Sequence, residues 1–220
     1  MTGRPSLTCR SEVPPRTSSR RGGLMARFTL FGLSLCLGCA HGPAPAPSAT
    51  ASASTAGRLP PSARYFPLAV GNRWTYDASY LGEKSTRTVE LVAFRDGSYL
   101  DRDGRQLRVD REGLRDQTRY LLHEPLAVGA TWTSVVGPGS AEHYRLLSLA
   151  EPCQVPAGRF SDCAEVESRA RVDGQRTLVN RVTFAAGVGI VGVRTELEQG
   201  GQAKLQAELR LTGYEVAPRN

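Results

Sequence analysis

Cys153 and Cys163 are the pair of residues in this chain whose type and spacing predict a covalent bond. They bracket a segment in which Pro156 and Gly158 can turn the chain back on itself, so that the two sulfur atoms meet. In an exported domain such a pair predicts a structural disulfide, which would contribute about 3 kcal/mol to stability. A metal or redox pair is the alternative, but redox motifs favour Cys-x-x-Cys and structural zinc takes four ligands. The disulfide is the favoured interpretation.

The other residues capable of chemistry do not form a catalytic or metal-binding pattern. His123 and His143 are the histidines of the C-terminal body, and neither has a second metal-type ligand at helical or strand spacing. A structural role is therefore favoured for both. The chain also lacks the Gly-x-Ser-x-Gly motif, whose strained turn presents the nucleophilic serine of many hydrolases. The sequence predicts no catalytic residue, no metal ligand and no cofactor.

A partial calcium-loop pattern is interpreted as a chance match. Asp101, Asp103 and Glu112 occupy positions 1, 3 and 12 of the template. Arg105, however, stands where an oxygen ligand belongs, and Gln106 stands where the loop needs glycine. This stretch is therefore expected to form a turn rather than a metal site.

Positive charge is concentrated in the first 39 residues. Of the formal net charge of +7, this segment contributes +5, from six arginines and one glutamate, and the remaining 22 basic and 20 acidic residues contribute +2. A nucleic-acid-binding domain needs its positive charge clustered on the folded part. We therefore expect no nucleic-acid partner.

Residues 1–38 have the features of a secretory signal peptide. A mostly apolar run of ten residues, 28–37, follows a basic segment. It is too short to span a bilayer as a helix, which takes about 20 apolar residues. The residues before Met25 are polar and rich in Arg, Pro and Ser, whereas Met25-Ala-Arg27 gives a short basic start. Translation is therefore expected to begin at Met25.

The apolar run ends in Leu37-Gly38-Cys39-Ala40, which resembles the lipobox of bacterial lipoproteins. That pattern usually has Leu three residues before the modified cysteine, where this chain has Cys36. The resemblance implies that Cys39 receives a diacylglyceryl group, becomes the new N-terminus and is acylated again with a fatty acid such as palmitate. Several acyl chains hold a protein durably on a membrane. An ordinary signal peptide with an incidental cysteine is the alternative.

The residues after Cys39 predict a tether and a location. Residues 40–57 contain no large apolar side chain and are rich in Ala, Pro and Ser, so they cannot offset the entropy of their own ordering. Residues 39–58 are therefore expected to be a lipidated, disordered tether. Ala40 in place of Asp favours export to the outer membrane in well-studied enteric systems, which predicts a cell-envelope protein facing the periplasm.

Residues 59–220 are expected to form a single antiparallel β domain. Alternation of apolar and polar residues at period two recurs along this segment, and Asp-Gly and Gly-Gly pairs supply hairpin turns between the runs. The run 203–211 could form a helix by composition, but its alternation and the preceding Gly200-Gly201 turn favour a strand. Roughly nine to eleven strands are expected, in a sandwich or a strongly curved half-barrel. The clearest runs are 74–80, 86–94, 106–110, 131–136, 142–147, 164–172, 176–184, 190–197 and 203–211.

A repeated stretch identifies residues that are expected to fix the architecture. Residues 67–75 and 125–133 share the pattern Pro-Leu-Ala-Val-Gly-x-x-Trp-Thr. Gly71 and Gly129 would permit a bend, and Trp74 and Trp132 would bury large side chains where a strand enters the sheet. The two copies suggest two similar strand entries, and hence a duplicated half-sheet.

Three motifs resemble those of a group of uncharacterised bacterial lipoproteins. The first comprises Tyr65-Phe-Pro-Leu68, Gly71-Asn72, Trp74 and Tyr76; the second Val155-Pro-Ala-Gly158, Phe160 and Asp162-Cys163; the third Ala186-Gly-Val-Gly-Ile-Val191. The resemblance implies an all-β, periplasm-facing domain on a lipid anchor. It implies no activity and transfers no catalytic residue.

Two functional hypotheses follow from the sequence. The first is a lipid-anchored, non-enzymatic envelope protein, attached to the membrane through Cys39, which binds a lipid or a protein partner or has a structural role. A curved sheet would give it a concave apolar face for an acyl chain or a partner. The alternative is an envelope hydrolase with an unrecognised site, which would need titratable groups converging in a cleft.

Overall fold

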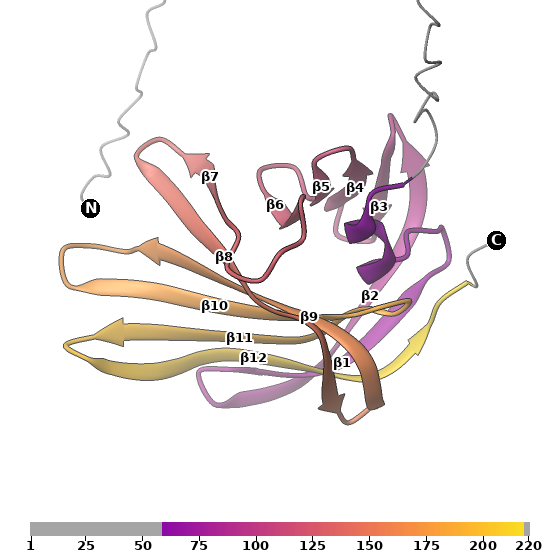
Figure 1. The fold of residues 1–220 in the computed structure, drawn as a ribbon. Helices are drawn as coiled ribbons and strands as arrows, with labels where there is room; N and C mark the ends of the chain where they lie inside the picture. The colour runs from indigo at the N-terminus through magenta and orange to yellow at the C-terminus, as the bar shows by residue number, and fades with distance from the viewer. Residues whose placement is uncertain (1–58, 218–220) are drawn as a thin grey trace, which may run out of the picture. The chain divides into compact units, whose positions relative to one another are not determined.

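The computed structural model describes residues 59–217 (Figure 1). The predicted signal peptide with Met25, and the predicted tether with Cys39, lie outside the described residues. Among the residues that are described, no helix has the length and apolar character needed to cross a membrane.

Twelve strands and one short 3-10 helix make up the secondary structure of the described segment (Figure 1). They are η1 (Pro61–Tyr65), β1 (Arg73–Tyr80), β2 (Glu83–Arg95), β3 (Ser98–Asp101), β4 (Gln106–Asp110), β5 (Gly113–Arg115), β6 (Tyr120–His123), β7 (Thr131–Gly137), β8 (Ser140–Val155), β9 (Gly158–Arg171), β10 (Arg176–Ala185), β11 (Gly189–Gln199) and β12 (Gln202–Glu215).

All twelve strands belong to one antiparallel sheet. Its order is β6-β5-β4-β3-β2-β1-β12-β11-β10-β9-β8-β7, so consecutive strands pair except β6 and β7, and β12 returns to pair with β1. The sheet therefore curls into a nearly closed barrel, with β3–β6 lying over β8–β12 in Figure 1. The prediction of an all-β antiparallel domain is confirmed. Of the two architectures expected, the curved sheet is correct and the sandwich is wrong.

The strand count exceeds the predicted nine to eleven because three strands are very short. β3, β5 and β6 have four, three and four residues, too few to show a reliable period. The run 203–211 lies within β12 and is a strand, as its alternation predicted.

Both copies of the repeated stretch form the same turn before a hairpin. Gly71 and Gly129 have φ angles of 94° and 87°, a left-handed conformation that favours glycine. The Gly71 N–H donates to the Leu91 carbonyl at 2.7 Å, and the Gly129 N–H donates to the Leu146 carbonyl at 2.8 Å. In each copy, this hydrogen bond therefore links the residues just before one strand (β1 or β7) to the next strand along the chain (β2 or β8).

The first and third motifs meet at the closed end of the barrel. The buried Trp74 indole donates to the Val188 carbonyl at 2.7 Å, and the Tyr76 hydroxyl donates to the Ile190 carbonyl at 2.9 Å. A Cβ on Gly189 would lie 3.1 Å from Trp74 Nε1, so this glycine lets the indole pack directly on the β10–β11 turn.

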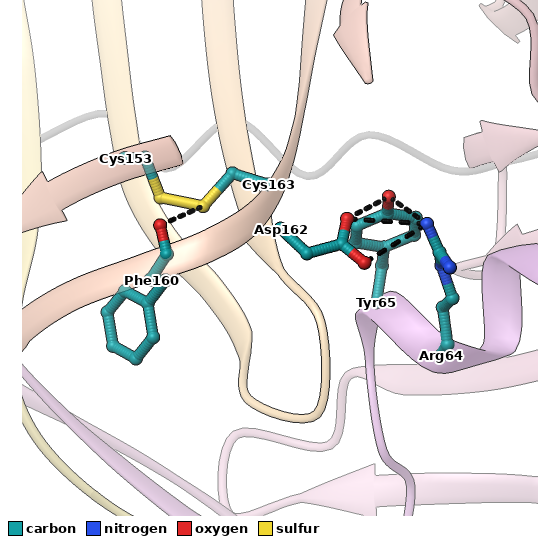
Figure 2. Close-up of a disulfide and its surroundings, with 6 residues drawn as sticks. All are labelled: Arg64, Tyr65, Cys153, Phe160, Asp162 and Cys163. Carbon is teal, nitrogen blue, oxygen red and sulfur yellow. Dashed lines mark hydrogen bonds and ion pairs between the residues drawn. A yellow bond between two sulfur atoms is a disulfide. The ribbon is translucent and has the colours of Figure 1, made fainter. Parts of the chain in front are cut away.

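The second motif joins the same end through η1 and a disulfide (Figure 2). The Tyr65 hydroxyl donates to Asp162 Oδ1 at 2.7 Å, and Arg64 forms an ion pair with Asp162 at 3.2 Å. Burial, together with the Asp162 hydrogen bond, raises the pKa of Tyr65. On the neighbouring residue, Cys163 forms a disulfide with Cys153 of β8, with the two Cα atoms 6.0 Å apart. The three motifs therefore build one packed end of the sheet.

The outer face of β9–β12 carries a ladder of ion pairs. Arg181 pairs with Glu167 at 2.9 Å and with Glu196 at 3.4 Å, and Arg194 pairs with Glu196 at 2.7 Å and with Glu208 at 3.5 Å. This face is polar and charge-balanced, so the apolar side chains of these strands gather on the concave face.

Candidate binding cavity

A cavity of about 510 Å³ occupies the concave side of the sheet. This volume falls within the ~300–1,000 Å³ typical of small-molecule sites. Side chains from ten strands and from the segments beside them line it. They are Phe66, Tyr76, Arg87, Val89, Asp101, Arg105, Gln106, Leu107, Asp116, Gln117, Arg119, Leu121, Tyr144, Val166, Ser168, Asn180, Val182, Phe184, Ile190, Val193 and Leu209.

The inner wall is apolar because the register aligns apolar residues of neighbouring strands. Val182 of β10 is the direct partner of Val166 on β9 and of Val193 on β11. Phe184 lies two residues further along β10 and is fully buried at the closed end. Because the partners across a sheet share a face, the strands together form a continuous apolar surface.

Two neutral polar side chains interrupt this wall part-way along. Ser168 and Asn180 are direct partners on β9 and β10, and both line the cavity. Asn180 Oδ1 accepts a hydrogen bond from Thr195 Oγ1 at 2.9 Å. Within residues 59–217, no hydrogen bond involves Asn180 Nδ2 or Ser168 Oγ. These groups can therefore bind a polar atom of a ligand that is otherwise apolar.

The charged residues that line the cavity are paired with each other or with nearby acids. Arg87 contacts Asp103 at 3.2 Å. Arg105 contacts Asp103 at 3.6 Å and Asp101 at 4.0 Å. Both aspartates of the rejected calcium pattern thus bond to arginine, in keeping with a turn.

Side chains bridge from Arg119 and β6 to β7 and β8, across the gap where β6 and β7 do not pair. Arg119 Nη1 donates to both carboxylate oxygens of Glu142 at 2.9 Å, and Arg119 Nε donates to Asp116 at 3.0 Å. The Trp132 indole donates to the Tyr120 carbonyl at 2.9 Å. We call this group, Asp116, Arg119, Tyr120, Trp132 and Glu142, the seam.

The surroundings of two side chains at the seam raise their pKa values. Burial opposes the charge on Arg119, but Glu142 and Asp116 outweigh it and raise the pKa of the guanidinium. The Tyr144 hydroxyl donates to Glu142, and burial followed by this hydrogen bond raises the pKa of Tyr144. Charged guanidinium and neutral phenol are therefore the stable forms of Arg119 and Tyr144 at neutral pH.

A second, smaller pocket of about 170 Å³ adjoins the cavity. Its lining comprises Ser98, Gln106, Arg108, Arg115, Asp116 and Gln117. Gln106, Asp116 and Gln117 line both spaces, so the two are neighbours at the start of β4 and the β5–β6 loop.

The cysteines and histidines singled out in the sequence lie away from the cavity lining, whereas Phe66, Tyr76 and Ile190 of the first and third motifs line it. Cys39 is outside the described residues, and Cys153 and Cys163 are joined at the β8–β9 turn. His143 is exposed and contacts Thr133 at 3.1 Å. His123 stacks on Trp132, with ring centroids 5.9 Å apart. In the described part of the chain, no cluster of three or more His, Cys, Asp or Glu could hold a metal ion.

The predicted architectural residues occupy two different environments. Trp74 is fully buried at the closed end, next to Phe66 at 5.0 Å between ring centroids. Trp132 is half-buried and stacks on Tyr144 at 5.2 Å. The residues that line the cavity were not identified from the sequence; the signal for them is the alternation itself, whose inward positions on β9 and β10 are Val166, Ser168, Asn180, Val182 and Phe184.

No protein-family model matches this chain, and no curated protein matches it. Among solved structures, a similar chain is that of a "putative lipoprotein from Parabacteroides distasonis ATCC 8503". The two are 12% identical with a TM-score of 0.37, and the alignment covers 69% of this chain and 98% of the other. A similarity of this size carries no information about what the cavity holds.

Proposed function

We propose that this chain is a lipid-anchored cell-envelope protein that binds a largely apolar small molecule in its cavity, without catalysing a reaction. The observation that carries the proposal is the apolar wall of the 510 Å³ cavity. Its exposed apolar surface is unfavourable in water and would be covered by a hydrocarbon ligand. Ser168 and Asn180 would bind a polar atom along that ligand.

The proposed location rests on Cys39. The lipobox-like sequence around it would attach the protein durably to a membrane, and Ala40 favours the outer membrane, with the domain in the periplasm. An apolar ligand and a membrane attachment are consistent with each other, because lipids are the abundant apolar molecules in the envelope.

The ligand proposal is tested by filling the cavity. Val182→Trp places a large side chain on the apolar wall, whereas Val135→Trp adds the same side chain at a position that is 74% exposed on β7. The full-length proteins are purified from membranes, transferred to amphipol and examined by native mass spectrometry. We expect a bound lipid in the wild type and in Val135→Trp, and its loss in Val182→Trp. Circular dichroism checks that both variants are folded. A wild type without bound lipid, or equal lipid in all three proteins, contradicts the proposal.

The attachment is tested by metabolic labelling with a tagged fatty acid. We expect label on the wild type and on Cys36→Ala, and no label on Cys39→Ala. The Cys36 variant is the matched control, because it removes a neighbouring cysteine of the same segment. Label that survives Cys39→Ala would show that the attachment lies elsewhere.

A further inference from the structure

Two arginines face each other across the β4–β5 hairpin, and too few acidic side chains lie near them to balance their charge. Arg108 and Arg115 are direct register partners, and both line the 170 Å³ pocket. Like charges directly opposite each other destabilise a sheet. This arrangement calls for a compensating negative charge.

In another pair of facing arginines, glutamates balance the charge of both side chains. Arg181 and Arg194 are also direct partners, but together they form ion pairs with Glu167, Glu196 and Glu208.

In the pocket, Arg108 has one distant acid, Asp110, at 3.8 Å. No carboxylate of the described segment lies within 4.0 Å of Arg115. Arg115 instead donates to the Asp116 carbonyl at 3.2 Å and the Gln117 carbonyl at 3.5 Å, and lies over the Tyr120 ring. Its guanidinium is therefore held in place while its charge is not neutralised.

The one acid in the pocket lining is already bonded to other groups, which offset part of its charge. Asp116 accepts hydrogen bonds from the Thr118 N–H at 2.8 Å and from the Arg119 N–H at 2.9 Å, and it pairs with the Arg119 guanidinium. It therefore opposes an incoming anion only weakly. The other lining residues, Ser98, Gln106 and Gln117, carry neutral hydrogen-bond donors.

We propose that this pocket is a subsite for a phosphate group, which is the polar head of the ligand whose apolar part occupies the cavity. Two arginines suit a tetrahedral oxyanion because each guanidinium can bind two of its oxygens. A volume of about 170 Å³ has room for a phosphate group together with some water, at ~30 Å³ for each water. Three residues, Gln106, Asp116 and Gln117, line both spaces, so the proposed ligand would pass from one to the other beside them. This inference rests on the proposed function.

The test compares three probes by calorimetric titration of the full-length protein in amphipol, stripped of bound lipid beforehand, in a buffer free of phosphate and sulfate. Hexyl phosphate carries the tail and the head, 1-hexanol carries the tail with a neutral head, and inorganic phosphate carries the head alone. Arg108→Gln/Arg115→Gln removes the subsite. Arg111→Gln/Arg171→Gln removes the same charge from two exposed positions outside both linings.

We expect the wild type to bind hexyl phosphate at least about tenfold more tightly than 1-hexanol, equivalent to about 1.4 kcal/mol. The subsite variant should lose this advantage and keep its affinity for 1-hexanol, and the control variant should behave as the wild type. If both alkyl probes bind equally to the wild type, the phosphate subsite is wrong and the apolar ligand stands. If inorganic phosphate binds through the arginines while neither alkyl probe binds, the pocket takes free phosphate, and both the head-group assignment and the proposed function are wrong. If no probe binds, both proposals are wrong.

Discussion

At the residue scale, the two tryptophans of the repeated stretch share a sequence context but not an environment. Trp74 has no exposed surface and donates a hydrogen bond to Val188, whereas Trp132 is half-buried in the seam. We expect Trp74→Ala to lower the free energy of unfolding by about 3–5 kcal/mol, the usual cost of truncating a buried tryptophan. Urea unfolding measures it.

Trp132→Ala is the matched comparison. It removes the same side chain in the same sequence pattern, and we expect a smaller loss because less buried area disappears. An unchanged unfolding curve for Trp74→Ala would contradict the architectural role of Trp74 and would indicate a binding role instead.

Tyr76 gives the protein a pH dependence at alkaline pH. Burial raises the pKa of its phenol above the ordinary value of 10.0. The folded state therefore holds its proton where the unfolded state releases it. The stabilisation from the neutral phenol is fully present below about pH 10 and is lost as the pH rises further. Each such tyrosine changes the free energy of unfolding by up to about 1.4 kcal/mol per pH unit in this range.

We expect Tyr76→Phe to reduce this alkaline loss. At neutral pH the variant should be less stable by about 1–3 kcal/mol, because the Ile190 carbonyl loses its donor, and the difference from the wild type should narrow above about pH 10. Urea unfolding between pH 8 and 11 measures both. Tyr80→Phe, at a tyrosine that is 66% exposed, should leave the change of the free energy of unfolding with pH as it is in the wild type. If the free energies of unfolding of the wild type and Tyr76→Phe changed equally with pH, Tyr76 would not be the source of the alkaline loss.

At the element scale, the β8–β9 hairpin is fixed at its turn in two ways. The disulfide joins Cys153 to Cys163, and the Ala157 N–H in the turn donates to the Leu211 carbonyl of β12 at 2.9 Å. We expect Cys153→Ser/Cys163→Ser to lower the free energy of unfolding by about 3 kcal/mol, because the unfolded chain regains the entropy of a closed loop. Urea unfolding measures this.

Reductant provides the control for that variant. Adding it should destabilise the wild type by a similar amount and leave the double serine variant unchanged. Equal stability of the wild type with and without reductant would show that the disulfide does not contribute.

The long strands could be predicted from the sequence, whereas the short ones could not. The strands β10, β11 and β12 alternate over ten or more residues, which identifies them by local pattern alone. β5 has three residues and becomes a strand only because β4 and β6 pair with it. Pairing of this kind depends on the rest of the sheet rather than on local sequence.

The cavity could not be predicted because it depends on register across many strands. A shift by one residue would turn Val166 and Val182 to the outer face. The arginine pair also depends on register: the β4–β5 hairpin turns at residues 111–112, which places Arg108 opposite Arg115. That pairing requires β5, a strand of three residues that was not predicted.

At the scale of the whole molecule, the repeated stretch divides the sheet into two halves of six strands. β1–β6 and β7–β12 each begin within one copy, and in each copy the glycine N–H donates to the second strand of that half, β2 or β8. The halves meet differently at their two junctions. β12 and β1 pair through backbone hydrogen bonds, whereas β6 and β7 are joined by side-chain contacts, those of the seam and the stacking of His123 on Trp132. The duplication hypothesis thus gains a structural parallel, and the seam is expected to be the weaker junction.

Glu142 is the residue that decides whether the seam stays closed. It binds Arg119 through both oxygens and accepts the Tyr144 hydroxyl. We expect Glu142→Gln to cost about 1–3 kcal/mol, because charge-assisted hydrogen bonds are lost while the shape is kept. Hydrogen-exchange mass spectrometry should show faster amide exchange in β6 and β7, which each lack a paired strand on one side. Exchange in β10 and β11 should not change, because both are paired on both sides and do not open with the seam.

Glu167→Gln is the matched control for the seam. The Glu167 side chain is 15% exposed, close to the 16% of Glu142, and it also pairs with arginines, Arg169 and Arg181. It lies on β9, however, where backbone hydrogen bonds hold both neighbouring strands. Its loss should therefore leave exchange in β6 and β7 unchanged. If the two variants give the same exchange pattern, side-chain pairing does not hold the barrel closed, and the cavity must be bounded by the backbone sheet alone.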